Sequence, residues 1–286
     1  MTVIMEVHFY PDPYAFNKVV KPFLMKHPVK NNLIIGILEN ISKDANTYSG
    51  IPPILAVVSH NNEIVLVSSR TPPWNSILSY TENLDAVDFF AIELSKKDPE
   101  TPGILGPKLA IQRFLKRWME LKKVKVELGM NERIYKLSEV NPDMLGNHEF
   151  ISANRKHKSI VKKWGYEFVT EAMPETPLDQ IERSLKRAMT HLKEGKIFLL
   201  LEEGKPVSMA RSIPTAFCGR LNYVYTPPEL RRKGFATECV AKLSQKLLEE
   251  HDYCVLFTDL ANPTSNSIYQ KIGYRPVMDV DLYKFI

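Results

Sequence analysis

Hydrophobic and polar positions follow two different patterns along this chain, which together predict a mixture of strands and helices. Short apolar runs bounded by turn-forming residues predict strands, whereas apolar positions three and four residues apart predict helices. In the first half, the pattern predicts helices over 31–43 and from Gly106-Pro107 to about 121. It predicts strands over 54–58, 63–69, 86–94, 124–128 and 134–137.

The second half repeats this mixture after a cluster of turn formers. Strands are predicted over 149–152, 197–201, 206–211, 221–226, 253–260 and 277–285, and helices over 155–171, 177–195, 234–250 and 263–272. The turn formers lie between Asn141 and Asn147 and predict a boundary between domains 1–141 and 142–286. The fold class expected from this order is α/β (α+β), with a mixed central sheet flanked by helices.

Composition narrows the class of protein without naming its activity. The chain has 286 residues, of which 44% are hydrophobic and 25% charged, as in ordinary globular proteins of about two domains. Cys218, Cys239 and Cys254 have no metal or redox spacing, which favours reduced thiols in the cytoplasm. The net charge of +5 suits an anionic ligand but is too dispersed for nucleic acid, and no apolar run predicts a membrane span.

The segment from Tyr223 to Thr237, YVYTPPELRRKGFAT, carries the most informative chemistry. A strand ends before two prolines, and a basic triplet then leads through Gly234 into a helix. The first turn of a helix has unpaired N–H groups and the positive end of the helix dipole, which suits an anion. Small residues at 234 and 236 allow close approach to the backbone. The segment therefore predicts a loop that binds a diphosphate.

Two motifs in the expected order make the sequence similar to the GNAT superfamily of acyl-CoA-dependent N-acyltransferases. The first is Arg231-x-x-Gly234-x-Ala236, preceded by Pro228-Glu229-Leu230. The second runs from Asn262 to Tyr274, NPTSNSIYQKIGY, and resembles the family's Asn…Tyr-x-x-x-Gly-Phe pattern. The resemblance covers roughly 149–286. It implies a mixed sheet whose central strands part to admit the pantetheine arm of acetyl-CoA.

The resemblance also implies a role for particular residues. The strand residues Val224, Tyr225 and Thr226 would bind the pantetheine arm. Asn262 and Ser265 would contact the far side of CoA, and Tyr269 would be the general acid that protonates the leaving thiolate. The diphosphate would be held by the backbone amides of Arg231, Arg232, Lys233, Gly234, Phe235, Ala236 and Thr237.

The acceptor side is less specified by the sequence. A primary amine of a small molecule or peptide is the expected acceptor, with Asp259, Glu229 or a water chain as candidates for the base that deprotonates it. No metal, nucleic acid or membrane is expected as a partner, and the protein would act as a monomer or homodimer. Alternatives are an acyltransferase that uses another acyl-CoA, as in glycine-acylating relatives, and a non-catalytic acyl-CoA-binding protein.

The first half lacks both motifs yet echoes their order of elements. A predicted strand over 86–94 precedes the glycine-bearing loop 103–108, GILGPK, which is followed by a helix and a strand. The whole chain therefore resembles bacterial two-domain members of the superfamily, with two tandem GNAT-like domains. The first domain would be a degenerate copy without a basic cofactor loop.

Overall fold

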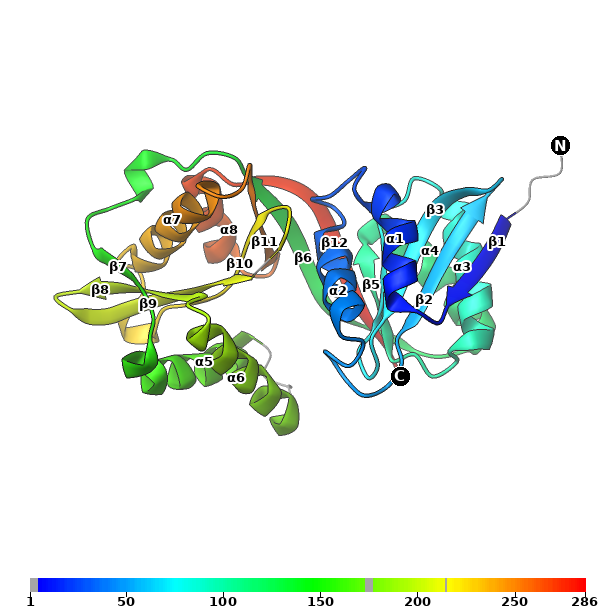
Figure 1. Ribbon diagram of the computed structural model, residues 1–286, viewed down its shortest axis with the longest axis horizontal. Helices are drawn as coiled ribbons and strands as arrows, with labels where there is room; N and C mark the ends of the chain where they lie inside the picture. The colour runs from blue at the N-terminus through cyan, green and yellow to red at the C-terminus, as the bar shows by residue number, and fades with distance from the viewer. Residues whose placement is uncertain (1–4, 173–176, 214) are drawn as a thin grey trace. The chain divides into compact units, whose positions relative to one another are not determined.

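The computed structural model describes residues 5–172, 177–213 and 215–286, which form two compact units (Figure 1). The first unit comprises Met1–Ile134, Asp259–Ala261 and Val277–Ile286, and the second comprises Tyr135–Thr258 and Asn262–Pro276. Among the described helices, none combines the length and apolar character needed to cross a membrane. The predicted α/β class, with helices flanking mixed sheets, is confirmed.

The first unit is a sheet with helices on both faces. Its strands follow the order β1-β2-β3-β4-β5-β12, and all neighbours are antiparallel except the parallel pair β4–β5. Helices α1 and α2 cover one face, and α3 and α4 cover the other (Figure 1). The elements are β1 (Met5–Tyr10), α1 (Pro13–Leu24), α2 (Asn32–Lys43), β2 (Ile54–His60), β3 (Glu63–Arg70), β4 (Ser76–Leu78), α3 (Leu84–Lys97), β5 (Gly103–Pro107), α4 (Lys108–Lys122) and β6 (Val126–Leu137).

The second half of the chain repeats this order of elements, although most of its last strand, β12, belongs to the first unit. The strands of the second unit follow the order β11-β10-β9-β8-β7, again antiparallel except for the parallel pair β10–β11. Helices α5 and α6 cover one face, and α7 and α8 the other. The elements are β7 (Glu149–Ser152), α5 (Lys158–Ala172), α6 (Leu178–Lys193), β8 (Ile197–Glu202), β9 (Lys205–Ile213), β10 (Gly219–Tyr225), α7 (Phe235–Leu248), β11 (Cys254–Asp259), α8 (Pro263–Ile272) and β12 (Arg275–Phe285), with short 3-10 turns at Pro142–Met144, Arg155–His157 and Pro228–Leu230.

Two sequence-based elements of the first half are wrong, and they change how the halves correspond. Residues 86–94 lie in helix α3, which Asn83 caps by accepting a hydrogen bond from the Ala86 amide. Residues 103–107, expected as the degenerate loop, form strand β5. The element that corresponds to α7 is therefore α3, and the counterpart of the cofactor loop is the β4–α3 connection, 79–83. Residues 126–137 form one strand, β6, rather than two.

The last strand does not group with the half that contains it in sequence. Residues 280–284 of β12 pair antiparallel with 103–107 of β5, and Val277–Ile286 belongs to the first unit. Gly103 permits this pairing, because a Cβ there would lie 2.3 Å from the Tyr283 carbonyl oxygen. The compact units therefore differ from the contiguous division 1–141 and 142–286.

In the second unit, a buried carboxylate ties the segment before β7 to helix α7. Glu238 accepts hydrogen bonds from the His148 backbone amide (2.8 Å) and pairs with the His148 ring nitrogen Nδ1 (2.6 Å) and the Lys242 ammonium (2.9 Å). Burial alone would raise the pKa of Glu238, but the hydrogen bonds from Lys242 and His148 outweigh it and lower the pKa. The carboxylate is therefore held in its charged form.

We expect Glu238→Gln to lower the unfolding free energy by about 1.5–3 kcal/mol at pH 7, the contribution of hydrogen bonds to a charged group. Because the folded pKa is depressed, this stability is present above the ordinary pKa of about 4.5 and is lost as pH falls through the folded value. Urea unfolding at several pH values checks this. The exposed Glu249→Gln on the same helix is the control, and an equal loss in both variants contradicts the assignment.

Candidate functional site

The site begins where strand β10 leaves its neighbours. Tyr223 has a positive φ of 57°, and the register with β9 shifts between Asn222 and Tyr225. The Tyr223 hydroxyl donates to the Gly165 carbonyl of α5 at 3.1 Å, and its ring packs 4.4 Å from that of Phe168. The bulge turns the Tyr223 side chain toward α5, and these two contacts hold it there.

Strand β10 pairs with β11 only near its start. The two strands are in register only at Gly219↔Cys254 and Arg220↔Val255. From 221 to 225, β10 therefore has no partner in β11, although β9 continues beside it. Parallel strands that part in the middle of a sheet leave backbone donors and acceptors for an extended ligand to bind. Val224 lies in this stretch, as the resemblance implies.

The neighbouring residues of β10 are held by side chains of the protein. The Ser208 hydroxyl donates to the Tyr225 carbonyl (3.3 Å) and lies 2.9 Å from the Thr226 hydroxyl. The Thr226 carbonyl accepts from the Arg231 Nε at 2.8 Å. Tyr225 and Thr226 are therefore fixed from the protein side, and Tyr223 and Val224 are the residues that stand outside the β9 register.

The loop after β10 turns sharply into α7. Arg232 has a φ of 65° and Gly234 a φ of 88°, both left-handed, and Gly234 is the N-cap of α7. No side chain of the described residues caps this helix, so the first-turn amides of Phe235, Ala236 and Thr237 remain for a ligand. A Cβ on Gly234 would meet nothing within 4 Å. The loop is open, basic and presents amides, which fits a diphosphate.

The three basic residues of the loop have different surroundings. Arg231 braces the loop, because its Nη2 pairs with Glu171 of α5 at 2.6 Å while its Nε holds Thr226. Arg232 and Lys233 are exposed, and the Lys233 ammonium lies 5.9 Å from the Phe235 ring centroid. The loop's positive charge toward a ligand therefore comes mainly from Arg232, Lys233 and the helix end.

Tyr269 is buried on α8, in the core cluster that also contains Phe235. Val224 packs against this cluster. Its ring centroid is 6.0 Å from that of Tyr274 and 6.5 Å from that of Tyr135. Burial raises its pKa to about 12. Its hydroxyl donates to no residue in the described part of the chain, so the phenol is protonated and unengaged.

The remaining candidates lie at the ends of β11 and around α8. Asn262 caps α8, and its Oδ1 accepts from the Ser265 amide at 3.0 Å, so its carbonyl oxygen already has a structural partner. Asp259 is exposed at the end of β11 and accepts from the Ala261 amide at 2.8 Å. Glu229 is exposed in the turn after β10. The structure brings neither carboxylate into the buried cluster around Tyr269.

The sequence analysis missed a buried cation on the opposite face of the same sheet. Arg211 of β9 is 8% exposed, and its Nε donates to the Asn222 Oδ1 at 2.9 Å. Its guanidinium carbon lies 4.5 Å from the Tyr223 ring centroid. Taking an ion out of water costs several kcal/mol, whereas a cation–π contact returns roughly 0.5–2 kcal/mol. Among the described residues, no carboxylate pairs with this guanidinium to make up the difference.

Its electrostatic surroundings are positive as well. Burial lowers the pKa of Arg211 to about 10; Tyr223 acts in the opposite direction, and Arg187 and Arg220 lower the pKa further. Burial, then Arg211, Arg187 and Lys196 lower the pKa of His191 to about 4. The Nδ1 of His191 is buried and has no hydrogen-bond partner within the described ranges. The available sequence signal was the position of Arg211, two residues after the apolar Met209. In a strand this spacing places both side chains on the same face.

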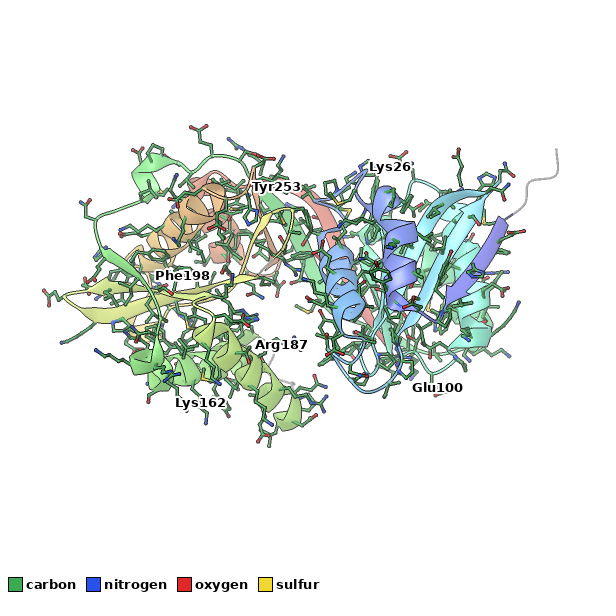
Figure 2. All side chains as sticks on the ribbon, viewed as in Figure 1. Lys26, Glu100, Lys162, Arg187, Phe198 and Tyr253 are labelled. Atoms are coloured by element: carbon green, nitrogen blue, oxygen red, sulfur yellow. The ribbon has the colours of Figure 1, made fainter. Side chains whose placement is uncertain are left out.

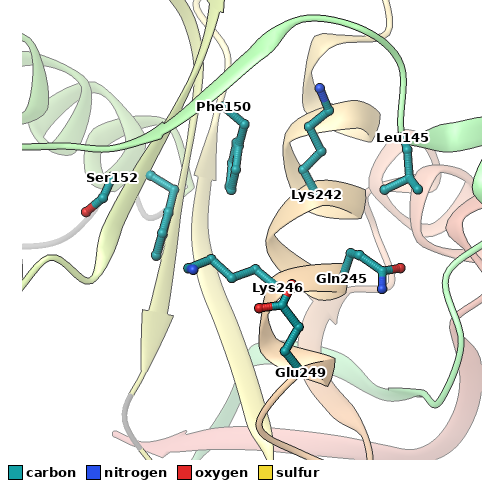
Figure 3. Close-up of a pocket in the computed structure, with 8 residues that line it drawn as sticks. Leu145, Phe150, Ser152, Lys242, Gln245, Lys246 and Glu249 are labelled. Carbon is teal, nitrogen blue, oxygen red and sulfur yellow. The ribbon is translucent and has the colours of Figure 1, made fainter.

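A separate hollow in the second unit lies beside α7 (Figure 3). It is lined by residues of the segment before β7, of β7 itself, of β8 and of the C-terminal half of α7: Leu145, Phe150, Ser152, Phe198, Lys242, Gln245, Lys246 and Glu249. Phe150, labelled in Figure 3, and Phe198, labelled in Figure 2, stack with their ring centroids 5.4 Å apart. None of the site residues expected from the sequence lines this hollow.

Comparisons with known proteins agree with the geometry of the second unit. Residues 200–282 match the model of the family described as FR47-like protein, which is related to the GNAT acetyltransferases. A search of curated proteins finds no significant match.

Solved structures match over most of their length. A Drosophila protein has a TM-score of 0.62 at 13% identity, covering 99% of this chain and 99% of its own. A GCN5-related N-acetyltransferase from Sphaerobacter thermophilus has a TM-score of 0.62 at 13% identity, covering 98% and 95%. A GNAT-family acetyltransferase from Colwellia psychrerythraea has a TM-score of 0.54 at 11% identity, covering 87% and 96%.

The structural likeness extends over both units, and the family match covers the segment that contains the parted strands and the loop into α7. The chain is therefore a GNAT-fold protein, with FR47-like sequence over residues 200–282.

Proposed function

We propose that this chain is an N-acetyltransferase that moves the acetyl group of acetyl-CoA to a primary amine. The observation that carries the proposal is the parting of β10 from β11 beside an uncapped, glycine-led helix N-terminus. One feature offers an extended backbone edge and the other offers amides for a diphosphate. A ligand with an amide-containing arm joined to a diphosphate, as in CoA, matches both.

In this reaction, each candidate residue has a distinct task. The amides of the loop and first turn of α7 bind the diphosphate, and the backbone at Val224 aligns the arm. The amine nitrogen attacks the thioester carbonyl carbon, and the carbon–sulfur bond breaks. The Tyr269 hydroxyl gives its proton to the departing sulfur, and the amine loses a proton to water or a base.

The cysteines support direct transfer in a ternary complex. Cys218, Cys239 and Cys254 are all buried, and burial raises the pKa values of Cys239 and Cys254 to about 12. A thiol with such a pKa is protonated at neutral pH and is a poor nucleophile. A covalent acyl-cysteine step is therefore not part of the proposal, which places the protein in the cytoplasm with its thiols reduced.

The first unit is proposed to be a degenerate copy without cofactor. Its strand β4 contacts β5 along its whole length, through the pairs Ser76↔Ile104 and Ile77↔Leu105 and through Leu78, whose carbonyl oxygen would lie 3.1 Å from a Cβ on Gly106. The connection from β4 to α3, SYTEN, has neither glycine nor a basic residue. A sheet without a gap and a loop without positive charge both support a structural role.

Calorimetric titration with acetyl-CoA, followed by turnover assays with an amine panel, tests the proposal. Micromolar binding and acetylated product support it. Tighter binding and faster turnover with longer acyl-CoA thioesters would favour the acyltransferase alternative. Binding without turnover of any amine would favour an acyl-CoA-binding protein, and absence of binding would overturn the proposal.

A further inference from the structure

The buried guanidinium of Arg211 lies next to the bulge of β10, on the sheet face covered by α5 and α6. Its Nε is held by Asn222, and its plane contacts Tyr223, the residue at which β10 bulges. The terminal nitrogens of Arg211 donate to no residue in the described ranges. The Nε atom is thus fixed, while the two terminal nitrogens of the guanidinium have no partner among the described residues.

Arg211 lies on the sheet face opposite the start of α7. Arg211 shares its face with Met209 and Tyr223 of the cluster packed on α5 and α6, whereas Phe235, at the start of α7, belongs to the cluster on the other face. Figure 1 shows these helix pairs on opposite sides of the sheet. The parted strands lie between them, so two ligands approaching from opposite faces would meet at Val224.

From these contacts we propose that Arg211 binds the carboxylate of the acceptor, so that the acceptor is an amino acid or another amine bearing a carboxylate. This inference rests on the proposed function in one respect, because only an acetyltransferase has an acceptor. The binding of a carboxylate at Arg211 can be tested without it.

Three features of the site favour a carboxylate. The planar fork of a guanidinium offers two parallel N–H donors that match the two oxygens of a carboxylate. The surrounding charges from Arg187, which Figure 2 labels on α6, and from Lys196 are positive. The unpartnered Nδ1 of His191 is a further buried polar atom coupled to the same guanidinium. A bound carboxylate would therefore pair with the Arg211 guanidinium, which has no carboxylate partner among the described residues.

The kinetic test compares amino acids with their carboxamides as acceptors, at saturating acetyl-CoA. We expect the intact protein to prefer the acids by at least 30-fold in kcat/KM. Arg211→Gln should raise KM for the acids at least 30-fold, leave KM for the amides within threefold, and leave acetyl-CoA affinity unchanged. Arg211→Lys should recover only part of the preference, because an ammonium lacks the planar fork.

The matched control is Arg183→Gln on α6, which removes an exposed guanidinium paired with Asp179. We expect it to leave every kinetic constant within twofold. Equal use of acids and amides by the intact protein, or an equal effect of Arg211→Gln on both series, would overturn the proposal while leaving the acetyltransferase reading intact.

A stability test does not require turnover. Because the largely buried Arg211 guanidinium has no carboxylate partner among the described residues, Arg211→Met should unfold at a higher urea concentration than the intact protein in the absence of ligand. N-acetylglycine at millimolar concentration should raise the unfolding midpoint of the intact protein and not that of Arg211→Met. A variant that unfolds at lower urea, together with no response of the intact protein to N-acetylglycine, would show that Arg211 is structural.

Discussion

Replacing Gly234 by glutamate is expected to weaken acetyl-CoA binding by about 100-fold or more. The new carboxylate would start from a position where a Cβ meets nothing within 4 Å and would reach the open amides at the start of α7. It would accept their hydrogen bonds and repel the diphosphate. A 100-fold loss corresponds to about 2.7 kcal/mol, the value of one or two hydrogen bonds to a charged group.

The chain contains a closely matched control for this substitution. Gly204, in the turn between β8 and β9, also has a positive φ (73° against 88°) and also has open space around a Cβ. Gly204→Glu therefore introduces the same charge and similar backbone strain away from the loop. Calorimetric titration of both variants separates the effects. Equal losses would reflect general destabilisation, and retained affinity in Gly234→Glu would exclude the loop as the diphosphate site.

The second large effect is expected on turnover rather than binding. Tyr269→Phe should reduce kcat roughly 100- to 10,000-fold, the usual contribution of a general acid, and leave acetyl-CoA affinity unchanged. Because its pKa is raised to about 12, the Tyr269 hydroxyl stays protonated across the working range, so it should not produce an alkaline fall in kcat below about pH 11. Steady-state kinetics from pH 6 to 10 and calorimetry measure both.

Tyr274→Phe is the matched control. Tyr274 is buried in the same cluster, 6.0 Å from Tyr269 between ring centroids, but its hydroxyl lies 2.8 Å from that of Ser244. Its loss should lower the unfolding free energy by about 0.5–1.5 kcal/mol and spare kcat. Among the residues that the structure describes, the Tyr269 hydroxyl has no such partner, so Tyr269→Phe should be nearly neutral for stability. Full activity of Tyr269→Phe would exclude it as the acid.

The sequence predicted the second unit more fully than the first, for reasons visible in particular elements. Helix α8, Pro263–Ile272, and strand β7, Glu149–Ser152, match their expected bounds, because proline, glycine and turn formers mark their ends. Helix α3 was expected as a strand because AVDFFAIEL is a nearly continuous apolar run. A run of that length reads equally as a buried strand or as a buried helix.

The geometry of the candidate site could not be predicted from the sequence and is known only from the structure. Nothing local predicts a positive φ at Tyr223, since aromatic residues disfavour it, and the contact that holds its side chain is with the distant Gly165 on α5. The parting of β10 from β11 is likewise a property of strand pairing, not of either strand's composition. Arg211 was overlooked because periodicity treats a charged residue in a strand as outward-facing, and here it faces inward.

The membership of β12 in the first unit has a consequence for synthesis of the chain. A ribosome releases the N-terminal segment first, and domains generally fold as they emerge. Strand β5 is made early, but its partner over residues 280–284 is made almost 180 residues later by the numbering of that pairing. The edge of β5 is therefore open during most of translation, and an unpaired edge is prone to wrong partners. The unit made first is thus the unit finished last.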